Sequence, residues 1–162
     1  MTDTEVSEYA VARLVAQAEE AGATITSEAA QRMIAHTAMV YHANAHTNLT
    51  RVPEVEAIAL HVLDSLTGLK EMQRSPDGPW LDLGSGAGYP GIPLGLAAAR
   101  HVDLLESVKR KAEFLERVVR ELRLDATVRL GRAEDAARAQ RTADPPLDAP
   151  PVPELPRPGA SR

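Results

Sequence analysis

The sequence of 162 residues contains no cysteine, only 3% aromatic residues and no long apolar run. Without cysteine there is no disulfide, no thiolate metal site and no cysteine nucleophile. Scarce aromatic residues argue against a surface built for stacking nucleic-acid bases. No stretch approaches the roughly 18 apolar residues of a membrane span, and the N-terminal residues are acidic, unlike a signal peptide. These absences favour a soluble cytoplasmic protein.

Positive charge is not in excess either, because 18 Lys and Arg face 23 Asp and Glu, for a net charge of −5. A generally basic nucleic-acid coat is therefore excluded, although a local basic face is not. Basic side chains do gather in one region: Lys109, Arg110, Lys111, Arg117, Arg120, Arg123, Arg129 and Arg132. Interleaved glutamates make a solvated helix face the simpler interpretation, with contact to RNA phosphates as the alternative.

Hydrophobic spacing of three and four residues predicts helices in the first part of the chain. The first covers 7–21 and ends at Gly22, the second begins after Thr26 and fades near Asn44, and the third covers 53–69. We therefore expect residues 1–72 to form a helical cap.

After a loop at 75–79 the pattern changes to alternating strands and helices, which is typical of a doubly wound parallel sheet. We expect an α/β fold with a partial Rossmann-like sheet, the N-terminal half of such a domain, over residues 79–140. The expected elements, in order, are a strand at 80–83, a glycine-rich turn at 84–91, a helix at 92–100, a strand at 101–105, a helix at 108–123 and a strand at 126–130.

The glycine-rich turn is the strongest chemical signal. Gly84, Gly86 and Gly88 let backbone amides approach a ligand with no Cβ in the way. Glu106, at the end of the next strand, is placed to accept both hydroxyls of a ribose. Together they predict a nucleoside-containing ligand, with an unliganded structural turn as the alternative.

Two cofactor classes compete for this turn. The run from Gly86 to Gly91 satisfies the dinucleotide fingerprint. The run from Asp82 to Gly88 is instead in the style of S-adenosyl-L-methionine sites, where the acidic residue lies near the charged amino-acid part of the ligand. If the strand ends at Leu83, Gly84 is the first glycine after it and S-adenosylmethionine is favoured over NAD.

Two weaker signals lie elsewhere. The loop 131–135 follows the third strand, where a backbone amide and a carboxylate can recognise adenine, although an ordinary helix N-terminus looks the same. His61 and Asp64, three residues apart on a helix, either hydrogen-bond each other or fasten the cap to the sheet. No set of histidines has metal-ligand spacing, so no metal is expected.

Several of these segments together resemble the family of ribosomal RNA small-subunit methyltransferase G, also called glucose-inhibited division protein B, from about residue 10 to 136. They are Asn48-Leu-Thr, His61-Val-Leu-Asp-Ser, the extended motif from Leu81 to Leu94, Leu104-Leu-Glu-Ser, Lys111-Ala-Glu-Phe-Leu and Gly131-Arg-Ala-Glu-Asp. The resemblance implies methyl transfer from S-adenosylmethionine to N7 of a guanine in bacterial 16S ribosomal RNA, with that RNA or the small ribosomal subunit as partner.

Site residues follow from the resemblance position by position. It implies that Gly84 and Tyr89 contact the cofactor, that Glu106 holds the ribose, and that Ala133 and Glu134 lie at the adenine. Guanine N7 is already a nucleophilic lone pair, so catalysis would consist of holding it in line with the methyl group.

The sequence also departs from the family pattern. Ala43-Asn44 stands where the family usually has Trp-Asn, and the family's fourth strand has no counterpart. Seven prolines between Asp144 and Arg162 instead predict a disordered segment at 141–162. We expect a frameshifted or C-terminally truncated product. The alternatives are a non-catalytic remnant that binds ribosomal RNA or a protein partner through the cap, and an NAD-linked oxidoreductase.

Overall fold

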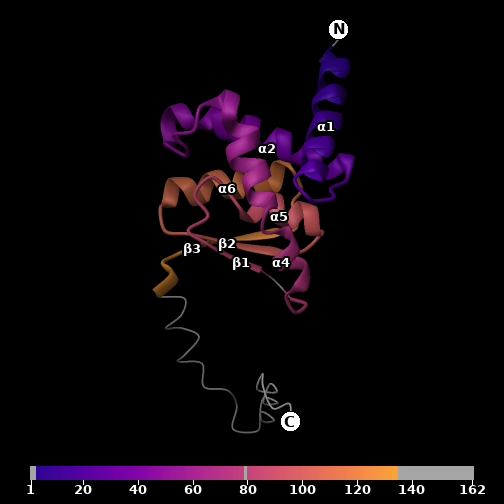
Figure 1. Ribbon diagram of the computed structural model, residues 1–162. Coiled ribbons are helices and arrows are strands. Elements are labelled where there is room, and N and C mark those ends of the chain that lie inside the picture. The colour runs from indigo at the N-terminus through magenta and orange to yellow at the C-terminus, as the bar shows by residue number, and fades with distance from the viewer. Residues whose placement is uncertain (1–2, 79, 135–162) are drawn as a thin grey trace, which may run out of the picture.

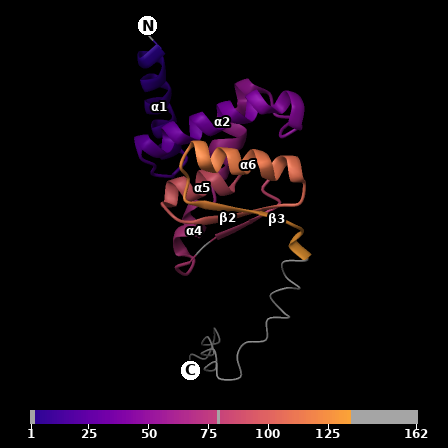
Figure 2. The ribbon, with the colours of Figure 1, turned by 180° about the vertical axis from the view of Figure 1, so that it is seen from behind.

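The structure is a computed structural model, and it describes residues 3–78 and 80–134 (Figures 1 and 2). Helices α2, α5 and α6 lie on the same side of a parallel sheet of three strands in both views. The expected α/β architecture with N-terminal helices is confirmed. The segment 141–162, predicted to be disordered, lies outside the described residues.

Two long helices begin the cap, α1 (Asp3–Glu20) and α2 (Ser27–Thr47). Thr26 starts α2, because its side-chain oxygen accepts a hydrogen bond from the backbone N–H of Ala29 at 3.1 Å. The helix continues past the predicted end near Asn44 and stops where Asn48 adopts a left-handed φ of 51°. Helix α2 is therefore about one turn longer than predicted.

The third predicted helix, 53–69, is broken into pieces. These are a 3₁₀ turn η1 (Glu54–Glu56), a π-helix η2 (Ile58–Leu63), a single turn α3 (Asp64–Leu66) and, after Gly68, a helix α4 (Leu69–Arg74). The Ser65 hydroxyl donates to the carbonyl of His61, a back-bond that bends helices. Hydrophobic spacing indicates which helix face is buried, but it does not indicate which carbonyl accepts the hydrogen bond of each backbone N–H.

The sheet follows the predicted alternation closely. Its elements are β1 (Trp80–Leu83), α5 (Gly91–Ala98), β2 (Val102–Glu106), α6 (Lys109–Glu121) and β3 (Ala126–Leu130). The strands are parallel in the order β1-β2-β3, with Trp80 beside Val102 and Val102 beside Ala126. Because the strands are parallel, their carboxyl ends meet at one edge, where the glycine-rich turn begins.

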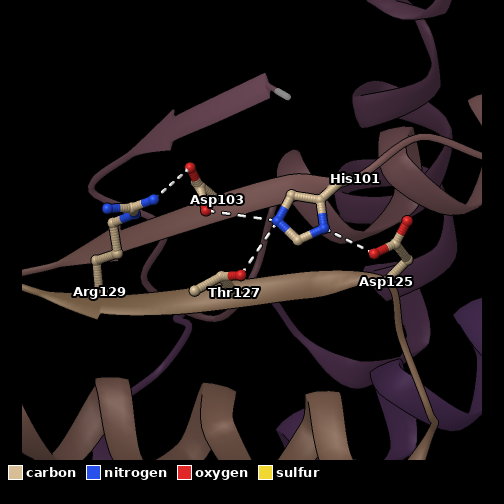
Figure 3. A network of polar contacts seen from close by, with 5 residues as sticks. All are labelled: His101, Asp103, Asp125, Thr127 and Arg129. Atoms are coloured by element: carbon tan, nitrogen blue, oxygen red, sulfur yellow. Dashed lines mark hydrogen bonds and ion pairs between the residues drawn. The ribbon is translucent and has the colours of Figure 1, made fainter. Parts of the chain in front are cut away.

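The face of the sheet turned away from α5 and α6 carries a polar network (Figure 3). Arg129 donates to Asp103 at 3.0 Å, and His101 contacts Asp125 at 2.7 Å and Thr127 at 3.1 Å. The hydrogen bond to Asp125 raises the pKa of His101. This network joins β2 to β3 and to the residue before β3, and it extends from the amino ends of these strands to Arg129.

One hydrophobic core extends through cap and sheet. It includes Leu14 of α1, Met33 of α2, Leu104 of β2 and Leu115 of α6, each at most 2% exposed. Helix α2 is thereby packed against both sheet helices, next to the glycine-rich turn. Within residues 3–78 and 80–134, no helix has the length and apolar character needed to cross a membrane.

Candidate functional site

The glycine-rich turn lies between β1 and α5, and its backbone is left-handed at three positions. The φ angles of Gly84, Gly86 and Gly88 are 76°, 56° and 97°, a region that other residues adopt only with strain. Strand β1 ends at Leu83 and α5 begins at Gly91, so the first glycine after the strand is Gly84. The strand therefore ends where the sequence predicted.

The glycines of this turn serve two different purposes. A Cβ at Gly84 would meet no heavy atom within 4 Å, and one at Gly86 would meet only the carbonyl of Gly84, at 3.7 Å. A Cβ at Gly88 would instead lie 2.5 Å from the Ile92 side chain. Gly84 and Gly86 therefore border open space at the carboxyl end of β1, whereas Gly88 is required by internal packing.

Glu106 fastens the turn to the neighbouring strand. Its carboxylate is 6% exposed, and one oxygen accepts the Gly86 N–H at 2.8 Å while the other accepts the Val108 N–H, also at 2.8 Å. The Ser107 hydroxyl makes a third, longer contact of 3.5 Å with the second oxygen. A carboxylate has about four lone-pair sites, so one remains for a further donor. The structure thus brings the predicted ribose acceptor to the glycine turn and gives it a structural role there as well.

Asp82 lies under the turn on the side of α5. Its side chain accepts the Gly91 N–H at 3.2 Å, and its backbone carbonyl accepts the Ser85 hydroxyl at 3.0 Å. Burial raises the pKa of this carboxyl group. Asp82 therefore bonds to Ser85 of the turn and to Gly91, the first residue of α5. Contact of Asp82 with the charged end of a ligand stays a prediction.

Tyr89 points toward the cap. Its ring lies between the rings of His36 and His61, with centroid distances of 4.7 Å and 4.5 Å, and it is nearly parallel to the ring of His61. Because the Thr37 hydroxyl donates to the Met33 carbonyl, the Tyr89 hydroxyl donates to Thr37 at 3.0 Å. Burial raises the pKa of Tyr89 to about 12. Cofactor contact by Tyr89 stays a prediction.

His36 of α2 is a site residue that the sequence analysis missed. It is 0% exposed, and its Nε2 lies 2.7 Å from the carbonyl oxygen of Ala87, inside the glycine turn. Burial lowers its pKa to about 4, so the ring is neutral at pH 7. The available signal was a histidine between Met33 and Val40, on the mostly apolar buried face of the helix.

The buried His36 predicts a pH dependence of stability. Unfolded histidine takes up a proton below its usual pKa of 6.5, whereas folded His36 resists protonation until about pH 4. The unfolded state therefore binds more protons in this window, and the free energy of unfolding falls by about 1.4 kcal/mol per pH unit as the pH drops below 6.5. Above pH 6.5 His36 does not contribute to the pH dependence of the free energy of unfolding.

Urea unfolding of the wild type and of His36→Gln at pH 5 and pH 7 measures this effect. Asp82 and His61 also have shifted pKa values, but both proteins contain them, so the difference between the two slopes isolates His36. Parallel dependence on pH in the two proteins would contradict the prediction.

His61 and the loop after α2 fasten the cap. His61 Nε2 lies 2.8 Å from the Thr50 hydroxyl, and the Asn44 side chain accepts the backbone N–H groups of Leu49 and Thr50 at 2.7 and 3.0 Å. No hydrogen bond joins His61 to Asp64 among the described contacts. The interpretation that His61 pins the cap to the sheet agrees with its stacking on Tyr89.

Ala133 and Glu134 follow β3 at the same edge of the sheet. Both are exposed and begin a helical turn, and the preceding Gly131 N–H donates to the Glu106 carbonyl at 3.0 Å. The loop is therefore linked to the residue that holds the glycine turn. Asp135, the last residue of the predicted adenine loop, lies outside the described residues.

Two cavities lie near these elements. One of about 340 Å³ is lined by His61, Asp64, Tyr89 and Pro90 among others, and it adjoins the glycine turn. The other, of about 410 Å³, includes Arg100 and Asp125 in its lining and lies at the opposite ends of the strands. Neither lining includes Gly84, Gly86 or Glu106. Ligands of such sheets bind at the carboxyl ends of the strands, which is the end where the glycine turn lies. Among residues 3–78 and 80–134, no three His, Asp or Glu side chains group to hold a metal.

Comparison with known proteins identifies relatives of the chain. A family model described as rRNA small subunit methyltransferase G matches residues 29–144. The proteins of that name from Microcystis aeruginosa and Alkaliphilus metalliredigens are 42% and 33% identical to it, over 59% and 75% of the chain and 47% and 52% of their own lengths. The one from Pseudomonas putida is 36% identical over 67% of the chain and 50% of its own length. The chain spans about half the length of the curated relatives it matches.

Proposed function

The chain belongs to the rRNA small subunit methyltransferase G family, and from that premise we propose that it holds S-adenosylmethionine for methyl transfer to ribosomal RNA. The proposed acceptor is N7 of a guanine in 16S ribosomal RNA, presented as the RNA or as the small ribosomal subunit. The proposed compartment is the cytoplasm.

The observation that carries the proposal is the open turn at Gly84 and Gly86, held by the Glu106 carboxylate across the ends of two parallel strands. A Cβ at Gly84 would fill space that a ligand can take, so the residues present fit a nucleoside cofactor. In the dinucleotide fingerprint the first glycine directly follows the strand, but here that glycine is Gly84 and the fingerprint starts two residues later, at Gly86. This position favours S-adenosylmethionine over NAD.

Each residue then has a definite task. The backbone at Gly84 and Gly86 would hold the cofactor at the carboxyl end of β1, and the Glu106 carboxylate would accept from the ribose hydroxyls. The Ala133 amide and the Glu134 carboxylate would recognise adenine. The cofactor, when bound, supplies a methyl group on a sulfonium. Guanine N7 needs no base, so the protein contributes alignment of the two reactants.

Calorimetric titration of the purified chain with S-adenosylmethionine, and with NAD as a control, tests the cofactor. We expect saturable binding of S-adenosylmethionine alone. Binding of NAD, or no binding by a chain that circular dichroism shows to be folded, would overturn the proposal.

The acceptor is tested with radiolabelled S-adenosylmethionine and small ribosomal subunits from a strain that lacks this modification. We expect label in 7-methylguanosine after nuclease digestion and chromatography. Label in another nucleoside would refute the N7 assignment. Cofactor binding without any transfer would limit the chain to holding the cofactor.

A further inference from the structure

We propose that His36 is a positioning residue for cofactor binding, because its hydrogen bond to the Ala87 carbonyl fixes the shape of the glycine turn. The inference rests on the proposed function, since the turn is the proposed cofactor site. Neither the glycine motif nor any of the family segments quoted above includes His36, which lies 51 residues before Ala87.

The contact defines the state of the histidine ring. A carbonyl oxygen only accepts hydrogen bonds, so Nε2 carries the proton and donates it to Ala87 across 2.7 Å. The other nitrogen, Nδ1, is buried and has no hydrogen-bond partner in the described part of the chain. An apolar side chain at this position would avoid the cost of that unpaired nitrogen. The hydrogen bond to the Ala87 carbonyl requires a side-chain donor at position 36, which an apolar side chain would lack.

The Ala87 carbonyl is a sensitive point of the turn. Ala87 is itself 7% exposed and lies between Gly86 and Gly88, both in left-handed conformations from which glycine can readily depart. Glu106 holds the Gly86 N–H on one side of Ala87, and His36 holds the carbonyl on the other. Two side chains from distant parts of the sequence thus fix the Ser85–Gly86 and Ala87–Gly88 peptide groups, which flank the Gly86–Ala87 peptide, and with them the backbone of the proposed ligand site.

Gly88 and His36 are matched to each other. A Cβ at Gly88 would lie 3.0 Å from His36 Nε2 and 3.2 Å from Cε1. The third glycine of the motif therefore makes room for the imidazole that reaches the turn. The neighbouring Tyr89 ring contacts His36 in a tilted arrangement and stacks on His61, so the contact continues into the broken helix of the cap.

Two variants of similar length separate the donor from the bulk of the side chain. His36→Gln keeps an N–H donor at the ε position, whereas His36→Met fills similar space without a donor. We expect His36→Met to weaken S-adenosylmethionine binding by about tenfold, since the buried Ala87 carbonyl is left unpaired. We expect His36→Gln to restore most of the wild-type affinity. Calorimetry gives the affinities, and circular dichroism confirms that each variant is folded.

The outcomes separate the two proposals. Failure of the folded wild type to bind S-adenosylmethionine overturns the proposed function and this inference with it. Wild-type affinity in His36→Met overturns the inference alone, and so does an equal loss in both variants.

A spectroscopic measurement on the wild type decides the matter if His36→Met does not fold. Long-range proton–nitrogen correlation spectra report the tautomer of each histidine, with the exposed His42 and His46 as internal references. We expect His36 to be neutral with the proton on Nε2 at pH 7, and its Nε2 resonance to shift when S-adenosylmethionine is added. A proton on Nδ1, or an Nε2 resonance that does not shift when S-adenosylmethionine is added, would overturn the inference.

Discussion

Replacing Glu106 with glutamine is expected to weaken S-adenosylmethionine binding by about 100-fold, the largest loss foreseen for a single side chain here. The amide keeps one acceptor oxygen but turns an NH₂ group toward a backbone N–H, either that of Gly86 or that of Val108. A buried donor is then unpaired, the turn loses its anchor to β2, and the ribose loses a charged acceptor. The free energy of unfolding is expected to fall by about 1–3 kcal/mol as well.

Glu116→Gln is the matched control, because Glu116 is exposed on α6 and makes the same change of charge. Calorimetry and urea unfolding of both variants provide the comparison. Unchanged affinity in Glu106→Gln would remove Glu106 from the cofactor site, and unchanged stability would contradict the buried hydrogen bonds described above.

Replacing Gly91 with alanine is expected to destabilise the fold by about 1–3 kcal/mol, as overpacking of a closed core does. The new Cβ would lie 2.6 Å from the Asp82 carboxylate and 2.7 Å from the Leu104 side chain. Helix α5 must then move away from the sheet, and the hydrogen bond from the Gly91 N–H to Asp82 is lost.

Gly68→Ala is the control for Gly91→Ala. Gly68 has a right-handed helical conformation, and a Cβ there would meet the Leu94 side chain at an ordinary 3.5 Å. This change is expected to be neutral or to stabilise by about 0.4–1 kcal/mol, because alanine has less freedom in the unfolded chain. Urea unfolding measures both variants, and equal stability of the two would show that α5 yields to the added methyl group at no cost.

The sheet was the most predictable part of the fold. A short apolar run between a loop and a glycine-rich turn favours a strand, and β1 and β3 begin and end where expected. The burial was not predicted, since Leu81 and Leu83 of β1 are exposed. The region 53–69 was less predictable, since an apolar side chain every three or four residues fits α-, 3₁₀- and π-turns alike. The serine back-bond at Ser65 and the break at Gly68 are local effects that the spacing does not record.

The residues of the candidate site also differ in how well the sequence predicts them. The turn glycines and Glu106 could be proposed from the sequence, because a backbone that approaches a ligand needs residues of a defined kind at a defined spacing. His36 could not, because its role depends on which carbonyl lies opposite it in the folded chain. Tyr89 shows the same limit, since its sequence neighbours are the turn while its ring contacts the cap.

The bond between His36 and Ala87 has a consequence for the order in which the protein assembles. Its partners are 51 residues apart, so it is a contact of high sequence separation that forms only after the intervening loop has been closed. The strand and helix on either side of the glycine turn can form earlier from local interactions. The turn itself is completed when α2 docks, so its final shape is a property of the assembled core.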